Sequence, residues 1–150
     1  MENTMRKLNN AATKVFAGLV DGLQVGDAKK IDNAPGAFMA VSIDCLGGQQ
    51  GSRETDHGWA LFAVAHRYEA NGDLVSDPDV EFYVVEDPAN PGARAVYPTA
   101  IDHGPLGYHR YVHLDSAGHP ARVIPRGQAD LARFCDLWMR NIAAQQGLVA

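Results

Sequence analysis

The sequence predicts an α+β fold, in which an antiparallel meander sheet of about five to six strands is flanked by an N-terminal and a C-terminal amphipathic helix. Apolar residues recur at spacings of three and four near both ends of the chain, which is the period of a helix with one buried face. Between these ends, short apolar or alternating runs are separated by turns rich in Gly, Pro, Asn and Asp. Because the connections are short, consecutive strands are expected to pair antiparallel.

Size and composition indicate one ordinary globular domain spanning residues 1–150, with 46% hydrophobic and 21% charged residues. The net charge of −5 argues against a non-specific nucleic-acid-binding protein, which usually carries a basic patch. Cys45 and Cys135 have no metal-site spacing, which favours a reducing compartment. The polar N-terminus does not resemble a signal peptide, and no apolar run reaches the length of a membrane span. We therefore expect a cytoplasmic protein.

The first helix is expected over residues 4–23, capped by Asn3 or Thr4 and ended by Asp21-Gly22. Its apolar stripe consists of Met5, Leu8, Ala12, Val15, Phe16 and Leu19. Residues 24–31 follow as a short, polar candidate for an edge strand.

Residues 37–46 then alternate in polarity, as a half-buried strand does. The face predicted to be buried consists of Met39, Val41, Ile43 and Cys45. Residues 47–58 are rich in glycine and predict a loop. Residues 59–68 are apolar on both faces until His66, which is typical of a central strand covered on both sides. The two helices could lie together on one face of the sheet or cover both faces, and this strand favours the second arrangement.

An acidic turn over residues 69–73 is expected to lead into a strand that begins at Asp77-Pro78, since proline is tolerated at the first residue of a strand. Residues 94–101 predict an edge strand, because Pro98 lacks the N–H that a central strand needs. Two further strands, at residues 108–114 and 121–124, are joined by a hairpin loop.

The last helix is predicted over residues 125–146. Its apolar stripe consists of Leu131, Phe134, Cys135, Trp138 and Ile142. A thiol within such a stripe is usually buried and inert, so Cys135 is not expected to be a nucleophile.

The acidic turn is the candidate binding surface, because exposed polar residues on loops carry most recognition functions. A second candidate is the glycine-rich loop around Arg53 and Glu54. The complete set of candidate binding residues is His66, Glu69, Asn71, Asp73, Asp77, Asp79, Arg53 and Glu54.

Two other functions remain open. Converging carboxylates near His66 could hold a hard cation or a transition metal, or support acid–base catalysis. The spacing does not match a calcium-binding EF-hand loop, however, and Asp and Asn are common in turns because they bond nearby backbone amides. We assign no catalytic residue, metal or cofactor. Nucleic-acid binding is the other alternative, through Arg122, Arg126, Arg133 and Arg140.

Three stretches of the chain resemble an uncharacterised family of small domains found on phages, plasmids and integrative elements of proteobacteria. The first is Lys30-Ile31-Asp32-Asn33-Ala34-Pro35-Gly36-Ala37-Phe38-Met39-Ala40-Val41. The second is Ala65-His66-Arg67-Tyr68-Glu69-Ala70-Asn71-Gly72-Asp73-Leu74, followed by Asp77-Pro78. The third runs from Gln128-Ala129-Asp130-Leu131-Ala132-Arg133-Phe134 through Trp138 and Asn141-Ile142 to Ala144-Gln145-Gln146, so the similar core covers about residues 28–146.

This resemblance implies a genetic context and no particular chemistry. Small acidic proteins of mobile elements often act by binding host proteins. We therefore expect a non-enzymatic protein-binding module whose partner is a host or mobile-element protein, such as an inhibitor of host defence of the anti-CRISPR or anti-restriction type.

Overall fold

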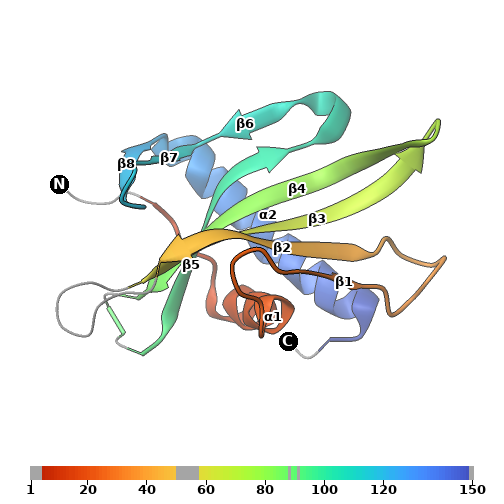
Figure 1. Cartoon of the computed structure of the whole chain (residues 1–150), viewed down its shortest axis with the longest axis horizontal. Helices are drawn as coiled ribbons and strands as arrows, with labels where there is room; N and C mark the ends of the chain where they lie inside the picture. Colours follow the sequence, from red (N-terminus) through yellow and green to blue (C-terminus); the bar gives the residue numbers. More distant parts are fainter. Residues whose placement is uncertain (1–4, 50–57, 88, 91, 149–150) are drawn as a thin grey trace.

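The computed structural model describes residues 5–49, 58–87, 89–90 and 92–148. It confirms the α+β fold, with an antiparallel six-stranded sheet and one helix near each end of the chain (Figure 1). The sheet strands are β1 (Ala28–Ile31), β2 (Val41–Gln49), β3 (Trp59–Ala70), β4 (Asp73–Glu86), β5 (Arg94–Asp102) and β6 (Tyr108–Arg110). The other elements are α1 (Asn10–Val20), a 3-10 turn η1 (Gly104–Leu106), β7 (Val112–Leu114), β8 (Pro120–Val123) and α2 (Pro125–Gln146).

The sheet is a simple meander, because its spatial order β1-β2-β3-β4-β5-β6 is also the order along the chain. Each strand pairs antiparallel with the next, as short connections require. Strands β7 and β8 form a separate two-stranded ladder. Among the described residues, no helix is long and apolar enough to cross a membrane.

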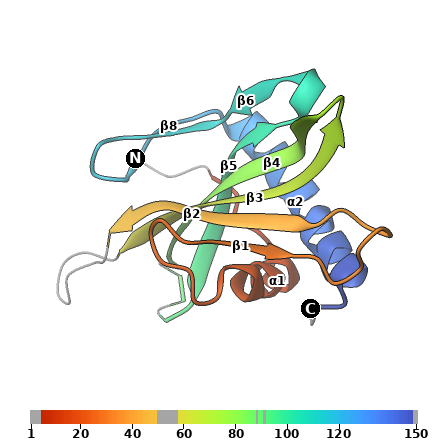
Figure 2. The same ribbon diagram turned by 45° about the vertical axis from the view of Figure 1, so that its right-hand side comes forward.

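Both helices pack on the same face of the sheet. The Phe16 ring of α1 lies 5.8 Å from Phe62 and 4.9 Å from Phe82, measured between ring centroids. On the same side of β3, His66 lies 5.5 Å from the Trp138 ring of α2. Figure 2 shows α1 and α2 beside each other against the sheet. The prediction that the helices cover both faces is therefore wrong.

We call the face of the sheet turned away from the helices the open face. Strand β3 is apolar on this face although no helix among the described residues covers it. Two of its β3 side chains, Ala63 and Ala65, are small and are buried without a helix above them. The β7–β8 hairpin also packs there. A Cβ on Gly118 would lie only 2.1 Å from the Trp59 ring, so this contact requires glycine.

Helix α1 begins six residues later than predicted. Asn9 is its N-cap, and its side chain accepts a hydrogen bond from the Ala12 N–H at 2.8 Å. The residues before it are extended, and the Leu8 N–H donates to the Val96 carbonyl of β5 at 2.8 Å. Leu8 still reaches the core, which is why its position fitted the helical period.

Strand β4 begins at Asp73 rather than at Asp77-Pro78, which corrects the predicted strand start. Asn71 and Gly72 alone form the turn, and both have positive φ, as the tightest hairpin turns require. Residues 77–78 stand opposite the single residue His66, because Ala65 pairs with Asp79 and Arg67 with Ser76. This β-bulge accommodates the proline inside the strand.

Strand β5 is an edge strand only in part. Its last three residues pair with β6, but Pro98 lies where β5 has only β4 as a strand neighbour. The predicted strand over residues 108–114 is broken at Tyr111, since the Tyr111 N–H donates to Thr99 and its carbonyl accepts from Ile124. The chain leaves the sheet at this residue.

Helix α2 has the predicted bounds and ends on Gly147 in the left-handed conformation. One member of its predicted stripe is misplaced, because Phe134 is 41% exposed. Two glutamines that the stripe did not include are buried at its ends. The Gln128 amide bonds both backbone groups of Arg6 and the Pro98 carbonyl, and the Gln146 amide bonds the Asn33 N–H and the Met39 carbonyl.

Replacing Gln128 with Ala should lower the free energy of unfolding by about 2–3 kcal/mol, because it leaves buried backbone groups without partners. The measurement is thermal or urea unfolding, and the melting temperature should fall by about 5–10 °C for a domain of this size. Gln145→Ala, in the same helix and only half-buried, is the control and should change stability little. Equal effects of both substitutions would contradict this role of Gln128.

Candidate binding surface

The β3–β4 hairpin projects beyond the rest of the sheet. Strand β2 stops pairing with β3 at His66, and β5 stops pairing with β4 at Asp79. Residues 67–76 therefore form a two-stranded extension that no other strand of the described residues flanks, visible at the upper right of Figure 1. An isolated pair of strands stabilises itself poorly, so an extension of this kind is typical of a recognition element.

Four of the predicted binding residues lie on this extension or at its base and are exposed. They are Glu69, Asn71, Asp73 and Asp77. The turn residues Asn71 and Gly72 place Glu69 and Asp73 close to the tip, where strands β3 and β4 pair Glu69 with Leu74. The sequence therefore located an exposed acidic end of the molecule correctly.

The structure adds apolar side chains to this end that sequence analysis missed. Leu74 is 68% exposed, Leu106 is 80% exposed and Tyr108 is 57% exposed. The η1 turn lies against β4, since a Cβ on Gly104 would come within 2.6 Å of the Ser76 carbonyl oxygen. We call this combined area the hairpin surface, and its residues are Glu69, Asn71, Asp73, Leu74, Asp77, Leu106 and Tyr108.

His66 does not belong to the hairpin surface, which corrects its predicted place beside the carboxylates. It is 6% exposed and faces α2, where its Nδ1 accepts a hydrogen bond from the Trp138 indole N–H at 3.3 Å. Because Nδ1 accepts, the proton of the neutral ring is on Nε2, which is buried and has no partner. Burial lowers the pKa of His66, although the charge of Asp77 opposes this. His66 is thus a packed neutral histidine.

Asp79 is not part of the hairpin surface, because it pairs with Arg67, whose guanidinium lies 3.6 Å from the Asp79 carboxylate. Burial raises the pKa of Asp79, and Arg67 counteracts that rise. Asp102, Asp44 and Glu81 raise this pKa further through their like charges. Asp79 therefore belongs to a partly buried ion pair on the open face.

The other predicted candidates have different outcomes. Arg53 and Glu54 lie outside the described residues. Within the described part of the chain, no three His, Cys, Asp or Glu side chains are grouped so that they could hold a metal ion. Cys135 is fully buried, and burial raises the pKa of its thiol well above the usual value, so the thiol is inert.

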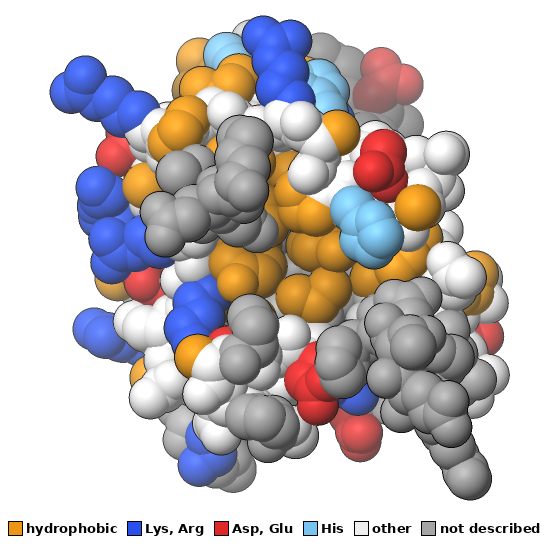
Figure 3. All heavy atoms as spheres, turned by 90° about the vertical axis from the view of Figure 1, so that its left-hand side faces the viewer, with side chains coloured by type: hydrophobic (Ala, Val, Ile, Leu, Met, Phe, Trp, Pro, Cys, Tyr) orange, Lys and Arg blue, Asp and Glu red, His pale blue; other side chains and the backbone are white. Residues whose placement is uncertain are grey.

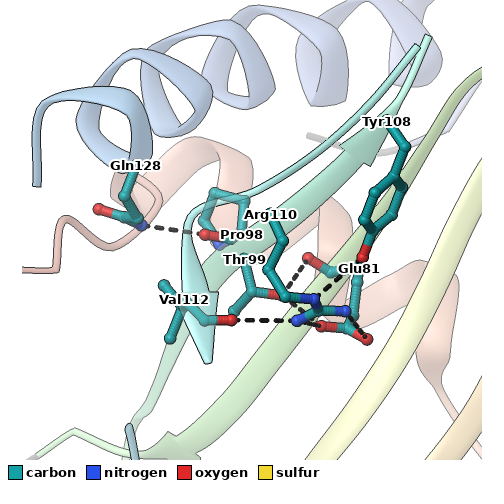
Figure 4. A network of polar contacts seen from close by, with 7 residues as sticks. All are labelled: Glu81, Pro98, Thr99, Tyr108, Arg110, Val112 and Gln128. Atoms are coloured by element: carbon teal, nitrogen blue, oxygen red, sulfur yellow. Dashed lines mark hydrogen bonds and ion pairs between the residues drawn. The ribbon is translucent and has the colours of Figure 1, made fainter. Parts of the chain in front are cut away.

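A polar network that the sequence did not reveal connects three strands on the open face (Figure 4). The guanidinium of Arg110 on β6 lies 2.8 and 3.1 Å from the two carboxylate oxygens of Glu81 on β4. The Thr99 hydroxyl donates to Glu81 at 2.6 Å, and Arg110 also donates to the Val112 carbonyl at 3.0 Å. Burial alone would raise the pKa of Glu81, but Arg110 and Thr99 bring it below its usual value.

This network is structural, because Glu81 and Arg110 neutralise each other and the Arg110–Val112 hydrogen bond fixes the chain where it leaves the sheet.

A row of aromatic rings lies farther along the open face. The centroids of Trp59 and Tyr83 are 6.5 Å apart, and those of Tyr83 and Tyr97 are 6.4 Å apart. The strand ends that carry it are on the left in Figure 1, and hydrophobic side chains gather on that side in Figure 3. The central ring of the row, Tyr83, is only 4% exposed, so it contributes to packing and offers little surface to a ligand.

Comparisons with known proteins identify a family and no activity. A family model described as a domain of unknown function (DUF6908) matches residues 4–148. No curated protein matches the chain, and no solved structure matches it either.

The buried histidine predicts a pH dependence of stability. Because the pKa of His66 is lower in the folded chain than in the unfolded one, the unfolded chain takes up a proton first as pH falls. The contribution of His66 is complete above pH about 6.5 and is lost below it, by at most about 1.4 kcal/mol per pH unit.

Urea unfolding between pH 7.5 and 5 measures this loss. His66→Phe should flatten the pH dependence, although it also costs about 1–3 kcal/mol at every pH because the Trp138 N–H loses its acceptor. The exposed His113 provides the control, and His113→Gln should leave the slope as it is. An unchanged slope in His66→Phe would show that His66 is not the group involved.

For the Glu81–Arg110 pair, Glu81→Gln should reduce the free energy of unfolding by about 2 kcal/mol at pH 7. Because the pKa of Glu81 is lowered on folding, the wild-type advantage over this variant should disappear as pH falls below about 4.5. Asp130→Asn, which removes a solvent-exposed pair with Arg133, should cost less than about 0.5 kcal/mol. Equal losses would refute the distinction between the two pairs.

Proposed function

Because the chain belongs to the DUF6908 family, for which no activity is described, we propose from the molecule itself that it is a protein-binding module without catalytic activity of its own. The partner is a host or mobile-element protein, in keeping with the resemblance to small proteins of phages, plasmids and integrative elements. Inhibition of a host defence system, of the anti-CRISPR or anti-restriction type, is the role that this context favours.

The observation that supports the proposal is the hairpin surface. Leu74, Leu106 and Tyr108 are each more than half exposed, although a monomeric protein gains nothing by leaving them in water. Apolar and aromatic side chains surrounded by polar ones are the usual anatomy of a protein interface.

The charges around these side chains indicate the chemistry of the partner. Glu69, Asp73 and Asp77 are exposed carboxylates at the same end of the molecule, and the whole chain has a net charge of −5. A basic protein surface would be attracted to this end and would associate faster at low salt. The hairpin projects from the sheet, so it can enter a concave site on such a partner.

The alternative of a metal-binding or hydrolytic site lacks a comparable observation among the described residues. Its central residue, His66, is buried against α2 and bonds to Trp138. General acid–base catalysis needs the histidine within reach of a substrate, and His66 is 6% exposed.

The experiment is affinity capture from a proteobacterial host lysate with tagged wild-type protein and two variants. The first variant is Asp73→Lys with Asp77→Lys, and the second is the control Asp130→Lys on α2. One stoichiometric host protein should be retained by wild type and by the control, and binding should fall at least tenfold in the hairpin double variant.

Because all three aspartates are exposed, folding should be unaffected, which circular dichroism and thermal unfolding check. Leu74→Ser tests the apolar part of the same surface and should also weaken capture. Equal capture by all variants would overturn the assignment of this surface. Recovery of no stoichiometric host protein would count against the binding function.

A further inference from the structure

A second set of exposed apolar residues lies on α2, on the side away from the core. Phe134 is 41% exposed and Leu137 is 53% exposed, and Asn141 and Ala144 are exposed as well. Their spacings of three, four and three residues place them along one line of the helix. We call this line the outer seam. It has the pattern of the a and d positions of a helix that pairs with another helix.

Three arginines follow the outer seam along one side. Arg126, Arg133 and Arg140 are exposed and recur every seven residues, so they stand about 10 Å apart on the same side of the helix. Arg133 has Asp130 at 3.6 Å, but 52% of its side chain remains exposed. All three occupy the position that flanks an a residue, where charges select the partner of a paired helix.

We propose that α2 docks an acidic amphipathic helix of another protein along the outer seam. Apolar residues of that helix would cover Phe134 and Leu137. Its Glu or Asp residues would pair with the three flanking arginines. The two parts of the seam thus specify different properties of the ligand, namely an apolar stripe and negative flanks.

A second copy of this chain is a poor occupant. In an antiparallel pair of α2 helices, the flanking arginines of one copy would face those of the other, and like charges repel. In a parallel pair they would face the opposite flank, where Leu131 and Trp138 are buried in the core of their own chain. The seam therefore fits a different protein.

Duplex DNA also fits less well, although the arginines alone would suit its phosphates. Phe134 and Leu137 lie beside the arginines and have no partner on a phosphate backbone. The outer seam lies on the helix side of the sheet, whereas the hairpin surface is formed by the projecting strand ends, so the two sites can fail independently.

The test uses the full chain and two synthetic peptides of three heptads. One has Leu at a and d and Glu at e and g, which keeps it from pairing with itself. The other has Lys in place of Glu. Titration into isotope-labelled protein should shift the backbone amide signals of α2 with the Glu peptide and leave them in place with the Lys peptide.

Arg133→Glu with Arg140→Glu should weaken binding of the Glu peptide at least tenfold, and Leu137→Ser should weaken it similarly. Arg94→Glu, an exposed arginine on β5, is the control and should bind as wild type does. Thermal unfolding confirms that each variant is folded.

Three results would overturn the proposal. One is equal binding of both peptides, and another is undiminished binding by the double arginine variant. The third is tight, salt-dependent binding of a duplex DNA that displaces the Glu peptide, which would make this a nucleic-acid surface. Loss of the peptide interaction would leave capture of a host protein by the hairpin surface unaffected.

Discussion

Two buried glutamines hold α2 across the sheet, and the rest of the fold depends on that placement. Gln128 is fully buried, and its amide joins the start of the helix to the extended N-terminal segment and to β5. Gln146 is 2% exposed and joins the end of the helix to the β1–β2 connection. A buried amide without partners is costly, so each glutamine allows only one position for its end of the helix. The apolar residues between them then complete a single core with α1.

Coverage of the sheet by helices on one face has consequences for the other. Within the described chain, no helix shields the open face from solvent. Small alanine side chains, the β7–β8 hairpin over Trp59 and the ion pair between Glu81 and Arg110 occupy it instead. The end of the β3–β4 hairpin extends beyond the strands that flank its base, and Glu69, Asn71, Asp73 and Leu74 stay exposed there. The parts of the molecule that remain available for recognition are those that this arrangement leaves uncovered.

The two surfaces proposed for recognition differ in charge and in shape. The hairpin surface is acidic and projects from the sheet, whereas the outer seam of α2 is straight and flanked by arginines. A small domain with a net charge of −5 therefore still presents a basic side. Such separation of charge favours specific orientation of partners over non-specific attraction.

The sequence by itself determined the succession of a helix, a run of strands and a second helix, the bounds of α2, the acidic hairpin and the burial of both cysteines, because these depend on local periodicity and turn chemistry. It placed the start of β2 wrongly, since that strand begins at Val41 and Met39, predicted to be buried, is 40% exposed. It could not tell that Phe134 is exposed and His66 is buried, since a residue at the border of an apolar face can point either to the core or to solvent. Only the tertiary structure decided that both helices lie on one face, that Leu8 reaches the core from an extended segment, and that Glu81 meets Arg110. These features join residues far apart in the chain, and such pairings leave no periodic signal in a single sequence.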